Sequence, residues 1–486
     1  MKHKSIVNKL IVILSTITAL GYVILDYVQA DHAMNAVLSL TLIVGLITTW
    51  YYASDNENVL TPSFLFIVSY TLVCFPVPLL IMMESGPVDL ISRWMPYPEN
   101  AAWTVNVALI GLACFISANI LFIPNEEIPN HNDHNSSLYF TLRDIAFVRM
   151  CLECISWISL LAFAILGGEA IAQGAYAQTV PGSAMAAYLV FETSIFALIS
   201  VEGTRIALAN SDKIGLMAYV LTFSRRTMIL LAMSCAVFFV LGDRGAILAP
   251  VLAFIAPFAL CQRGLRPMPV MLILVLGFAL MQMMAIGRSR DGGFDFYRVI
   301  QAVNGENDSL LVSSMFEFSG CYRSLNAASE PVALLNNHIP GQFQCGQLLT
   351  VLPVGGESFL YPLLGVTAAD MDSAAAITRF LNLGYGSGTT VVGELYLDFG
   401  MAGVVGGLFL FGILCRHVER QCRYRVNIFW VLLGCILMYK MLYLPRSQAL
   451  IGIRTFVWAW LMISFLISVS RLNIYTPNMF PKQRPL

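Results

Sequence analysis

The chain has 486 residues, of which 58% are hydrophobic and only 12% are charged, and its mean hydropathy is +0.73. A soluble domain carries about 25% charged residues, so this composition excludes an ordinary soluble protein and indicates a membrane protein with several α-helical spans. The formal net charge of −1 points to no particular partner, and no nucleic-acid partner is expected.

Apolar runs of roughly 20 residues recur along the chain, which is the length that an α-helix needs to cross a bilayer. The run after Lys2, Lys4 and Lys9 is too long for the apolar part of a usual secretory signal, so we interpret it as a retained span. The pattern predicts about twelve spans in an all-α polytopic fold. They cover residues 6–25, 33–52, 61–83, 101–123, 145–166, 183–204, 227–241, 246–262, 268–287, 389–414, 427–444 and 455–470.

Lysine and arginine residues are concentrated on one set of connecting segments, which predicts that those segments are cytoplasmic. Both termini are then inside, and the long polar interval after the ninth span faces outside. The segment 205–226 is predicted to be a cytoplasmic connection with an interfacial helix. We divide the chain into a bundle of nine spans (1–287), a large external loop domain (288–388), and three further spans with a cytoplasmic tail (389–486).

Two of the eleven cysteines, Cys321 and Cys345, lie in the external loop, and the other nine lie in spans or on the cytoplasmic side. Two cysteines alone in an oxidising compartment favour a disulfide over free thiols. We therefore expect a Cys321–Cys345 bridge.

Several arginines stand on the predicted outer side, against the inside bias. Charges at membrane depth or in tight outer turns are costly and commonly functional. Planar guanidinium groups match phosphate oxygens, so a converging set would form a phosphate-binding cluster; the alternative is pairing with lipid headgroups or neighbouring aspartates. The candidates are Arg244 in a short hairpin, Arg288 and Arg290 after the ninth span, and Arg446 and Arg454 between the last two spans.

Two residues of the external loop are candidate general bases. Glu317 lies between Phe316 and Phe318, where removal of water would raise its pKa and make it a useful base. His338 is the only histidine of the loop. An ordinary solvated or salt-bridged side chain is the alternative for each.

Two pairs of carboxylates complete the candidate set. Asp370 and Asp372 have the spacing of a metal–nucleotide-sugar site, but a helix beginning at Ser373 makes an N-cap the simpler interpretation. Glu394 and Asp398 are four residues apart and share one face of the tenth predicted span. They would bind a hydroxyl-rich ligand or pair with the outer arginines.

Four segments together resemble the bacterial O-antigen polymerases, the Wzy-type oligosaccharide repeat-unit polymerases. The overall layout, with about a dozen spans and one large late loop, is similar as well. The segments are Leu60–Phe66, Gly242–Gly245, Cys345–Pro353 and Gly384–Gly400.

The resemblance implies a C-type glycosyltransferase-like fold in the bacterial inner membrane, with the large loop in the periplasm. The implied reaction moves a growing glycan from undecaprenyl pyrophosphate to the non-reducing end of the next lipid-linked repeat unit, by inverting displacement. The arginines would stabilise the pyrophosphate leaving group, and Glu317 or His338 would activate the acceptor hydroxyl. Arginines can replace a divalent metal here, so no metal and no cofactor is expected. Membrane lipids and a chain-length regulator are further expected partners.

Two other functions remain open from the sequence. An O-antigen ligase shares this chemistry but uses lipid A–core as its acceptor. A glycan flippase is not an enzyme, and such carriers rarely need an external loop of this size. The nearly charge-free central spans also disfavour a flippase, because transport pathways are usually lined by polar or charged residues.

Overall fold

The computed structural model describes most of the chain. The described residues are 32–53, 60–82, 95–122, 142–168, 181–209, 214–241, 244–262, 321–330, 338–352, 360–383, 388–424 and 426–471, together with the single positions 270, 277, 283 and 386. Within these residues the regular structure is entirely helical. This agrees with the predicted all-α class.

The long helices form a membrane-type bundle. Eight helices in the described ranges are long and apolar enough to cross a bilayer, or nine if one bent pair counts as a span. The helices of the bundle are α2 (His32–Ala53), α3 (Pro62–Cys74), α4 (Pro76–Met82), α6 (Ala101–Leu121), α7 (Leu142–Leu166), α9 (Gly182–Ala209), α10 (Leu216–Thr222), α11 (Arg225–Val240), α12 (Arg244–Cys261), α21 (Val391–Tyr424), α22 (Ile428–Tyr443) and α23 (Ile453–Arg471).

Ten of the predicted spans correspond to described helices. The predicted span 6–25 lies outside the described residues, and so does nearly all of 268–287, so the total of about twelve remains a prediction. The C-type glycosyltransferase fold remains a prediction as well. Helix α21 runs ten residues past the predicted end at 414, because its last turns continue as a polar helix with Arg416, Arg420 and Arg423.

The connection around 205–226 differs in detail from the prediction. Helix α9 continues to Ala209, and the short apolar helix α10 then meets α11 at an angle of 100°. Tyr219 is buried and its hydroxyl donates to the Phe254 carbonyl at 2.9 Å, whereas Met217 and Leu221 are largely exposed. A short helix with one buried and one exposed apolar face suits a membrane interface.

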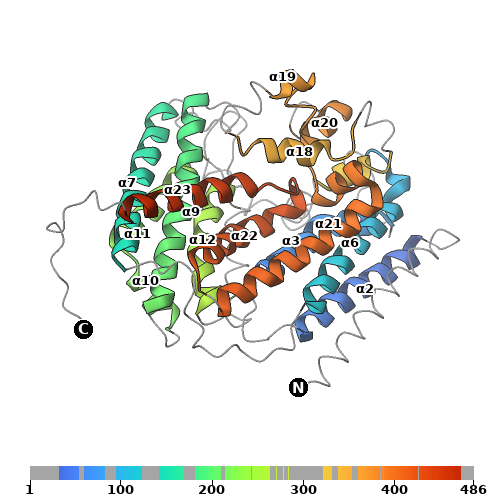
Figure 1. Cartoon of the computed structure of the whole chain (residues 1–486). Coiled ribbons are helices and arrows are strands. Elements are labelled where there is room, and N and C mark those ends of the chain that lie inside the picture. Colours follow the sequence, from blue (N-terminus) through green and yellow to red (C-terminus); the bar gives the residue numbers. More distant parts are fainter. Residues whose placement is uncertain are drawn as a thin grey trace.

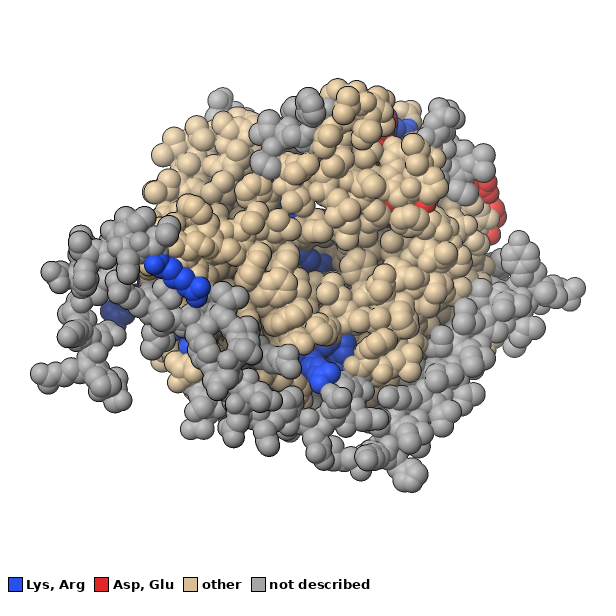
Figure 2. Space-filling model, viewed as in Figure 1, with Lys and Arg blue, Asp and Glu red and all other residues tan. Residues whose placement is uncertain are grey.

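Several further short helices, α18 (Gln342–Leu349), α19 (Tyr361–Leu364) and α20 (Ser373–Phe380) among them, gather at one end of the bundle, which we call the loop end (Figure 1). The others are η1 (Pro98–Asn100), α16 (Tyr322–Ala327) and η4 (Leu444–Arg446). The face shown in Figure 2 is mostly uncharged, and its charged side chains are few. Such a surface is expected for a protein surrounded by lipid.

Small residues let the membrane helices approach closely. A Cβ on Gly111 of α6 would lie 2.5 Å from Leu408 of α21 and 2.6 Å from the Tyr70 hydroxyl of α3. Gly412 of α21 packs directly against the backbone of Phe115. In a membrane, close packing and buried hydrogen bonds replace the hydrophobic effect as the force between helices.

The segment Leu60–Phe66 forms the start of α3 at the end of the bundle opposite the loop end. Thr61 caps the helix by accepting from Phe64 N–H at 3.2 Å, and Pro62 occupies the first turn. The buried Glu419 of α21 accepts from Ser63 N–H at 3.0 Å. A carboxylate at a helix N-terminus is favourable, so this part of the resemblance has a structural role in joining α3 to α21.

Helix α21 is broken at Gly400, which has φ 63° and ψ −154°. Only glycine adopts this conformation readily. Past the break, Gly403 packs against the carbonyl oxygen of Leu395, and Gly407 packs against the Leu395 side chain. Residues eight apart in a continuous helix lie about 12 Å apart along its axis, so the chain turns sharply here. A short first segment, Val391–Phe399, therefore precedes the long one.

Exchanging Gly400 for alanine tests this break. Gly400→Ala should lower the stability of the folded protein by about 1–3 kcal/mol, because a Cβ disfavours the observed backbone conformation. Gly406→Ala is the matched control, since Gly406 lies in the continuous helix with open space around its Cβ position. Thermal unfolding of the detergent-purified protein measures both. Equal behaviour of the two variants would show that α21 is not broken at Gly400.

Candidate functional site

The short first segment of α21 brings two carboxylates to the loop end. Thr390 caps this segment by accepting from Gly393 N–H at 3.1 Å. Glu394 and Asp398 lie one helical turn apart, as their spacing predicts, and both are buried. A small apolar core beside them joins the segment to the loop-end helices; it consists of Ala328, Phe343, Ile377 and Leu397.

Glu394 collects hydrogen bonds from three parts of the chain. Its Oε1 accepts from Gln344 Nε2 at 2.8 Å, from Gln347 Nε2 at 2.6 Å and from Ala449 N–H at 3.0 Å. Its Oε2 accepts from Ser373 Oγ at 2.5 Å. The residue is 0% exposed. These contacts hold α18, α20 and the turn after η4 together, which favours a positioning role for Glu394 over direct contact with a sugar.

The turn after η4 is attached to the loop-end helices by further bonds. Leu450 N–H donates to Gln347 Oε1 at 2.5 Å, and Gln448 Nε2 donates to Asp372 Oδ1 at 2.8 Å. Gln347 thus uses both ends of its amide, one on Glu394 and one on the turn. A fully satisfied polar network of this kind rigidifies a site.

Asp398 lies at the N-terminus of α18. Its Oδ1 accepts from Phe343 N–H at 3.3 Å and its Oδ2 from Gln344 N–H at 3.1 Å. Gly341, with φ +83°, lets the chain turn into the helix at this point, and it packs against the Phe399 ring. The amides and the dipole of a helix N-terminus attract an acidic side chain, so this position suits Asp398.

His338 pairs with Asp398. The distance from His338 Nε2 to Asp398 Oδ1 is 2.8 Å, and the two side chains are 8% and 0% exposed. The imidazole ring packs against the Phe343 ring with a centroid separation of 4.5 Å. Because a carboxylate only accepts, Nε2 carries the proton and Nδ1 is the nitrogen left to take another. This is the arrangement of an oriented general base.

The predicted arginines are only partly described. Arg446 ends η4 and Arg454 is the second residue of α23, and both side chains are half-buried. They flank the turn that contacts Glu394. Arg244 is the first residue of α12, but its side chain lies outside the described residues, as do Arg288 and Arg290. Convergence of the whole set remains a prediction.

Two other predictions concern the loop. Glu317 lies outside the described residues. The predicted disulfide does not form in this structure, because Cys321 and Cys345 are both free thiols. Cys321 is buried before α16 with its sulfur against Gly388, where a Cβ would lie 2.8 Å away, whereas Cys345 is exposed on α18. Packing against the entry to α21 therefore takes the place of a covalent bridge.

The carboxylates before α20 are structural. Asp372 caps α20 by accepting from Ala374 N–H at 2.8 Å, which confirms the N-cap interpretation. Asp370 binds the hydroxyl and the backbone N–H of Thr367 and lies 2.9 Å from Arg379. The hydrogen bonds from Thr367 and the Arg379 guanidinium lower the pKa of Asp370 to about 2. It stays ionised at neutral pH.

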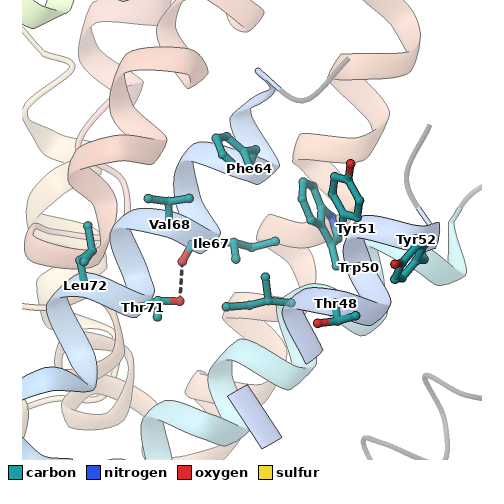
Figure 3. A pocket seen from close by; sticks show the side chains of 10 residues that line it. Thr48, Trp50, Tyr51, Tyr52, Phe64, Ile67, Val68, Thr71 and Leu72 are labelled. Carbon is teal, nitrogen blue, oxygen red and sulfur yellow. Dashed lines mark hydrogen bonds between the residues drawn. The ribbon is translucent and has the colours of Figure 1, made fainter. Parts of the chain in front are cut away.

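An apolar groove of about 520 Å³ lies between α2 and α3 (Figure 3), and neither Glu394 nor Asp398 lines it. Its lining carries no side chain that is charged at neutral pH, and so no cationic phosphate ligand and no general base near neutral pH. We do not assign it to the site. The lining residues are Ile47, Thr48, Trp50, Tyr51, Tyr52, Phe64, Ile67, Val68, Thr71 and Leu72.

Several residues of the site were not singled out from the sequence. Gln344, Gln347 and Ser373 are neutral and polar, and such residues carry little signal by themselves. A signal for Gln347 did exist, because it stands in Cys345–Pro353, one of the four segments that carry the family resemblance. Gly346 of that segment packs directly against Met371, so its lack of a side chain lets α18 meet the chain before α20.

Comparison with protein families supports the resemblance. The profile of the family described as O-antigen polysaccharide polymerase Wzy matches residues 9–476, which is nearly the whole chain. No curated protein and no solved structure gives a significant match.

Removing the Glu394 carboxylate tests its role in holding the loop end together. Glu394→Ala should lower the free energy of unfolding by at least about 3 kcal/mol, because several buried donors lose their acceptor. Glu394→Gln keeps the shape but turns an NH₂ group toward those donors, and should lower it too. Thermal unfolding and limited proteolysis of the purified protein measure the effect.

The control for this experiment is Glu99→Ala, which removes an exposed carboxylate. It should leave stability unchanged. A Glu394→Ala variant as stable and as protease-resistant as the control would contradict the positioning role.

Proposed function

The chain belongs to the O-antigen polysaccharide polymerase Wzy family, and from this premise we propose how it polymerises repeat units and which residues do so. Family membership supports polymerisation of lipid-linked oligosaccharide repeat units by an inner-membrane enzyme. We propose that His338, oriented by Asp398, is the general base. The hydrogen bond of 2.8 Å between these side chains is the observation that carries the proposal.

The proposed reaction is a single displacement with inversion. His338 Nδ1 takes the proton from a hydroxyl at the non-reducing end of one lipid-linked repeat unit. The hydroxyl oxygen attacks the anomeric carbon of the growing glycan, and the bond from that carbon to the pyrophosphate oxygen breaks. Undecaprenyl pyrophosphate leaves with the electron pair, and the lengthened glycan remains on the acceptor lipid. His338 then returns its proton to water.

Asp398 has two tasks in this scheme. It fixes the imidazole tautomer through Nε2–H, and it stabilises the imidazolium that forms when Nδ1 takes a proton. Asp398 is itself held by the first amides of α18, so the base is positioned by a rigid element. Glu394 acts one turn away by fixing α18 and the turn after η4.

The leaving group requires cations. We propose that Arg244, Arg288, Arg290, Arg446 and Arg454 stabilise the negative charge that develops on the pyrophosphate. Support comes from Arg446 and Arg454, which flank the turn bound to Glu394. Glu317 stays a second candidate base.

We propose that the loop end faces the periplasm and that both termini are cytoplasmic. Arg416, Arg420 and Arg423 lie in the last turns of α21, at the opposite end of the bundle from the site. Their positions agree with the rule that arginines gather on the cytoplasmic side. The acceptor and donor lipids would then meet the site from the outer leaflet, with residues 288–388 as the periplasmic loop domain.

The histidine is tested by the lipopolysaccharide ladder of a deletion strain that carries plasmid-borne variants. The deletion itself should leave a single repeat unit on the core, which distinguishes a polymerase from a ligase or a flippase. His338→Ala should lower the rate of polymerisation by about a hundredfold or more, because general bases contribute that much. Asp398→Asn should lower it too, since asparagine cannot stabilise the imidazolium.

The control is His417→Ala, which removes an exposed histidine on the late part of α21. It should leave the ladder normal at normal membrane level. A normal ladder with His338→Ala at normal expression would exclude His338 as the base and would turn attention to Glu317.

The arginines are tested in the same strain. Arg244→Ala and Arg288→Ala should each lower turnover by roughly a hundredfold, by analogy with removal of an oxyanion-hole donor. Lysine keeps the charge but loses the two-pronged geometry, so Arg→Lys should be impaired less than Arg→Ala. An arginine that only faces lipid should tolerate lysine almost fully. If alanine at both positions, singly and together, leaves a normal ladder, the pyrophosphate site lies elsewhere.

A further inference from the structure

A buried ion pair joins α9 and α22 near the loop end. Lys440 Nζ lies 3.3 Å from Glu192 Oε1, and the two side chains are 11% and 12% exposed. Lys440 stands three residues before the end of α22 at Tyr443, the end from which the chain enters η4 and the turn bound to Glu394. It is the only lysine between Lys213 and Lys482. Charged residues inside membrane helices are costly and commonly functional.

Helix packing alone gives no reason for these charges. A buried ion pair can often be replaced by apolar residues of similar volume without loss of stability. The lysine is also held by a second contact, since its Nζ lies 4.7 Å from the centroid of the Tyr439 ring. The ring of Phe196 lies 6.1 Å from that of Tyr439. An acid and an aromatic face thus keep an ammonium group in place among apolar side chains.

Lys440 packs against the turn between η4 and α23, which contacts the site. A Cβ on Gly452 would lie only 3.1 Å from Lys440 Cγ, so the turn packs tightly against the lysine stem, and a side chain at Gly452 would require that stem to shift. Two and three residues earlier, Leu450 and Ala449 donate their N–H groups to Gln347 and Glu394. The lysine is therefore linked to the acidic pair through a single short turn.

We propose that Lys440 binds the phosphate next to the polyprenyl chain of the lipid-linked substrate, with Glu192 as its counter-ion when no lipid is bound. This assignment rests on the proposed function. A lysine ammonium is a compact charge with three donors and a common phosphate ligand. Its flexible stem lets it move from Glu192 to an incoming phosphate.

The position of Lys440 along α22 indicates which of the two phosphates it binds. It lies about 4.5 Å along α22 from the end of the helix, whereas Arg446 and Arg454 lie beyond that end, around the turn. The phosphate attached to the polyprenyl chain is the deeper of the two in a lipid pyrophosphate. Lys440 therefore binds the deeper phosphate, which is bonded to the polyprenyl chain. The arginines bind the outer phosphate, whose bond to the sugar breaks in the reaction.

Binding of two lipid probes tests the assignment on the purified full-length protein in nanodiscs. Undecaprenyl phosphate carries only the deeper phosphate, and undecaprenyl pyrophosphate carries both. Lys440→Met should weaken binding of both probes by about tenfold, since one charged hydrogen bond is lost. Lys440→Arg should weaken them less. Lys213→Met, the matched control, should bind both as the unchanged protein does.

A charge exchange separates binding from a structural clamp. Glu192→Lys combined with Lys440→Glu keeps the ion pair but moves the cation to α9, so the protein should fold and still bind both probes weakly. Binding at the original strength in this double variant, or in Lys440→Met, would overturn the proposal. If Lys440→Met does not fold, Glu192→Gln with Lys440→Met removes both charges and takes its place.

The result does not depend on the catalytic assignment. His338→Ala should leave the binding of both probes unchanged, because neither probe carries the sugar hydroxyl on which that residue acts. A normal ladder with His338→Ala, together with weakened binding by Lys440→Met, would refute the proposed base and support the lysine assignment. The reverse pair of results would refute the lysine and leave the base in place.

Discussion

The buried carboxylate of Glu394 is the contact on which the loop end depends. It accepts hydrogen bonds from α18, from the first residue of α20 and from the turn between η4 and α23, and these parts are far apart in the sequence. A carboxyl group buried away from water is stable only when such hydrogen-bond partners surround it. The same requirement makes the arrangement specific, because a displaced helix would leave a buried polar group without a partner.

Asp398 links this arrangement of helices to the candidate general base, His338. Its position one turn after Glu394 brings it to the N-terminus of α18, and two backbone amides hold it there. The imidazole of His338 is then oriented by a carboxylate that cannot move freely. Orientation of this kind is what a general base needs before a substrate arrives. The site is therefore prepared by backbone amides and neutral amide side chains as much as by charged residues.

Much of the fold follows from strong local signals, and the site follows only in part. Apolar runs long enough to cross a membrane predict most of the helices, and the spacing of Glu394 and Asp398 predicts their common face. His338 was a candidate from its place in the loop, but its partner lies 60 residues away, and no local pattern reports a contact of that length.

Three features show where local patterns fail. The sequence predicts an interfacial helix within 205–226, and α10 lies there, but its angle of 100° to α11 depends on packing that hydropathy does not report. The expected disulfide was inferred from the compartment, whereas packing decides which thiols can meet. Lys440 carries no local sequence signal of its own, and only its neighbours Glu192 and Gly452 distinguish it from other basic residues.

The break at Gly400 has a consequence for how the chain enters the membrane. The insertion machinery selects apolar stretches of about 20 residues, and after Gly400 the apolar part of α21 is a shorter run, residues 401–415, with Arg416 at its end. A short apolar run of this kind can still span when the flanking basic side chains extend to the interface. The two carboxylates precede that stretch, so they need not be carried into hydrocarbon with it. The energetic cost of burying Glu394 then arises later, when the loop folds, and the donors that offset it are delivered by the same folding step. Membrane insertion of α21 and assembly of the site are therefore separate steps, and Gly400 marks the boundary between the two parts of the helix involved.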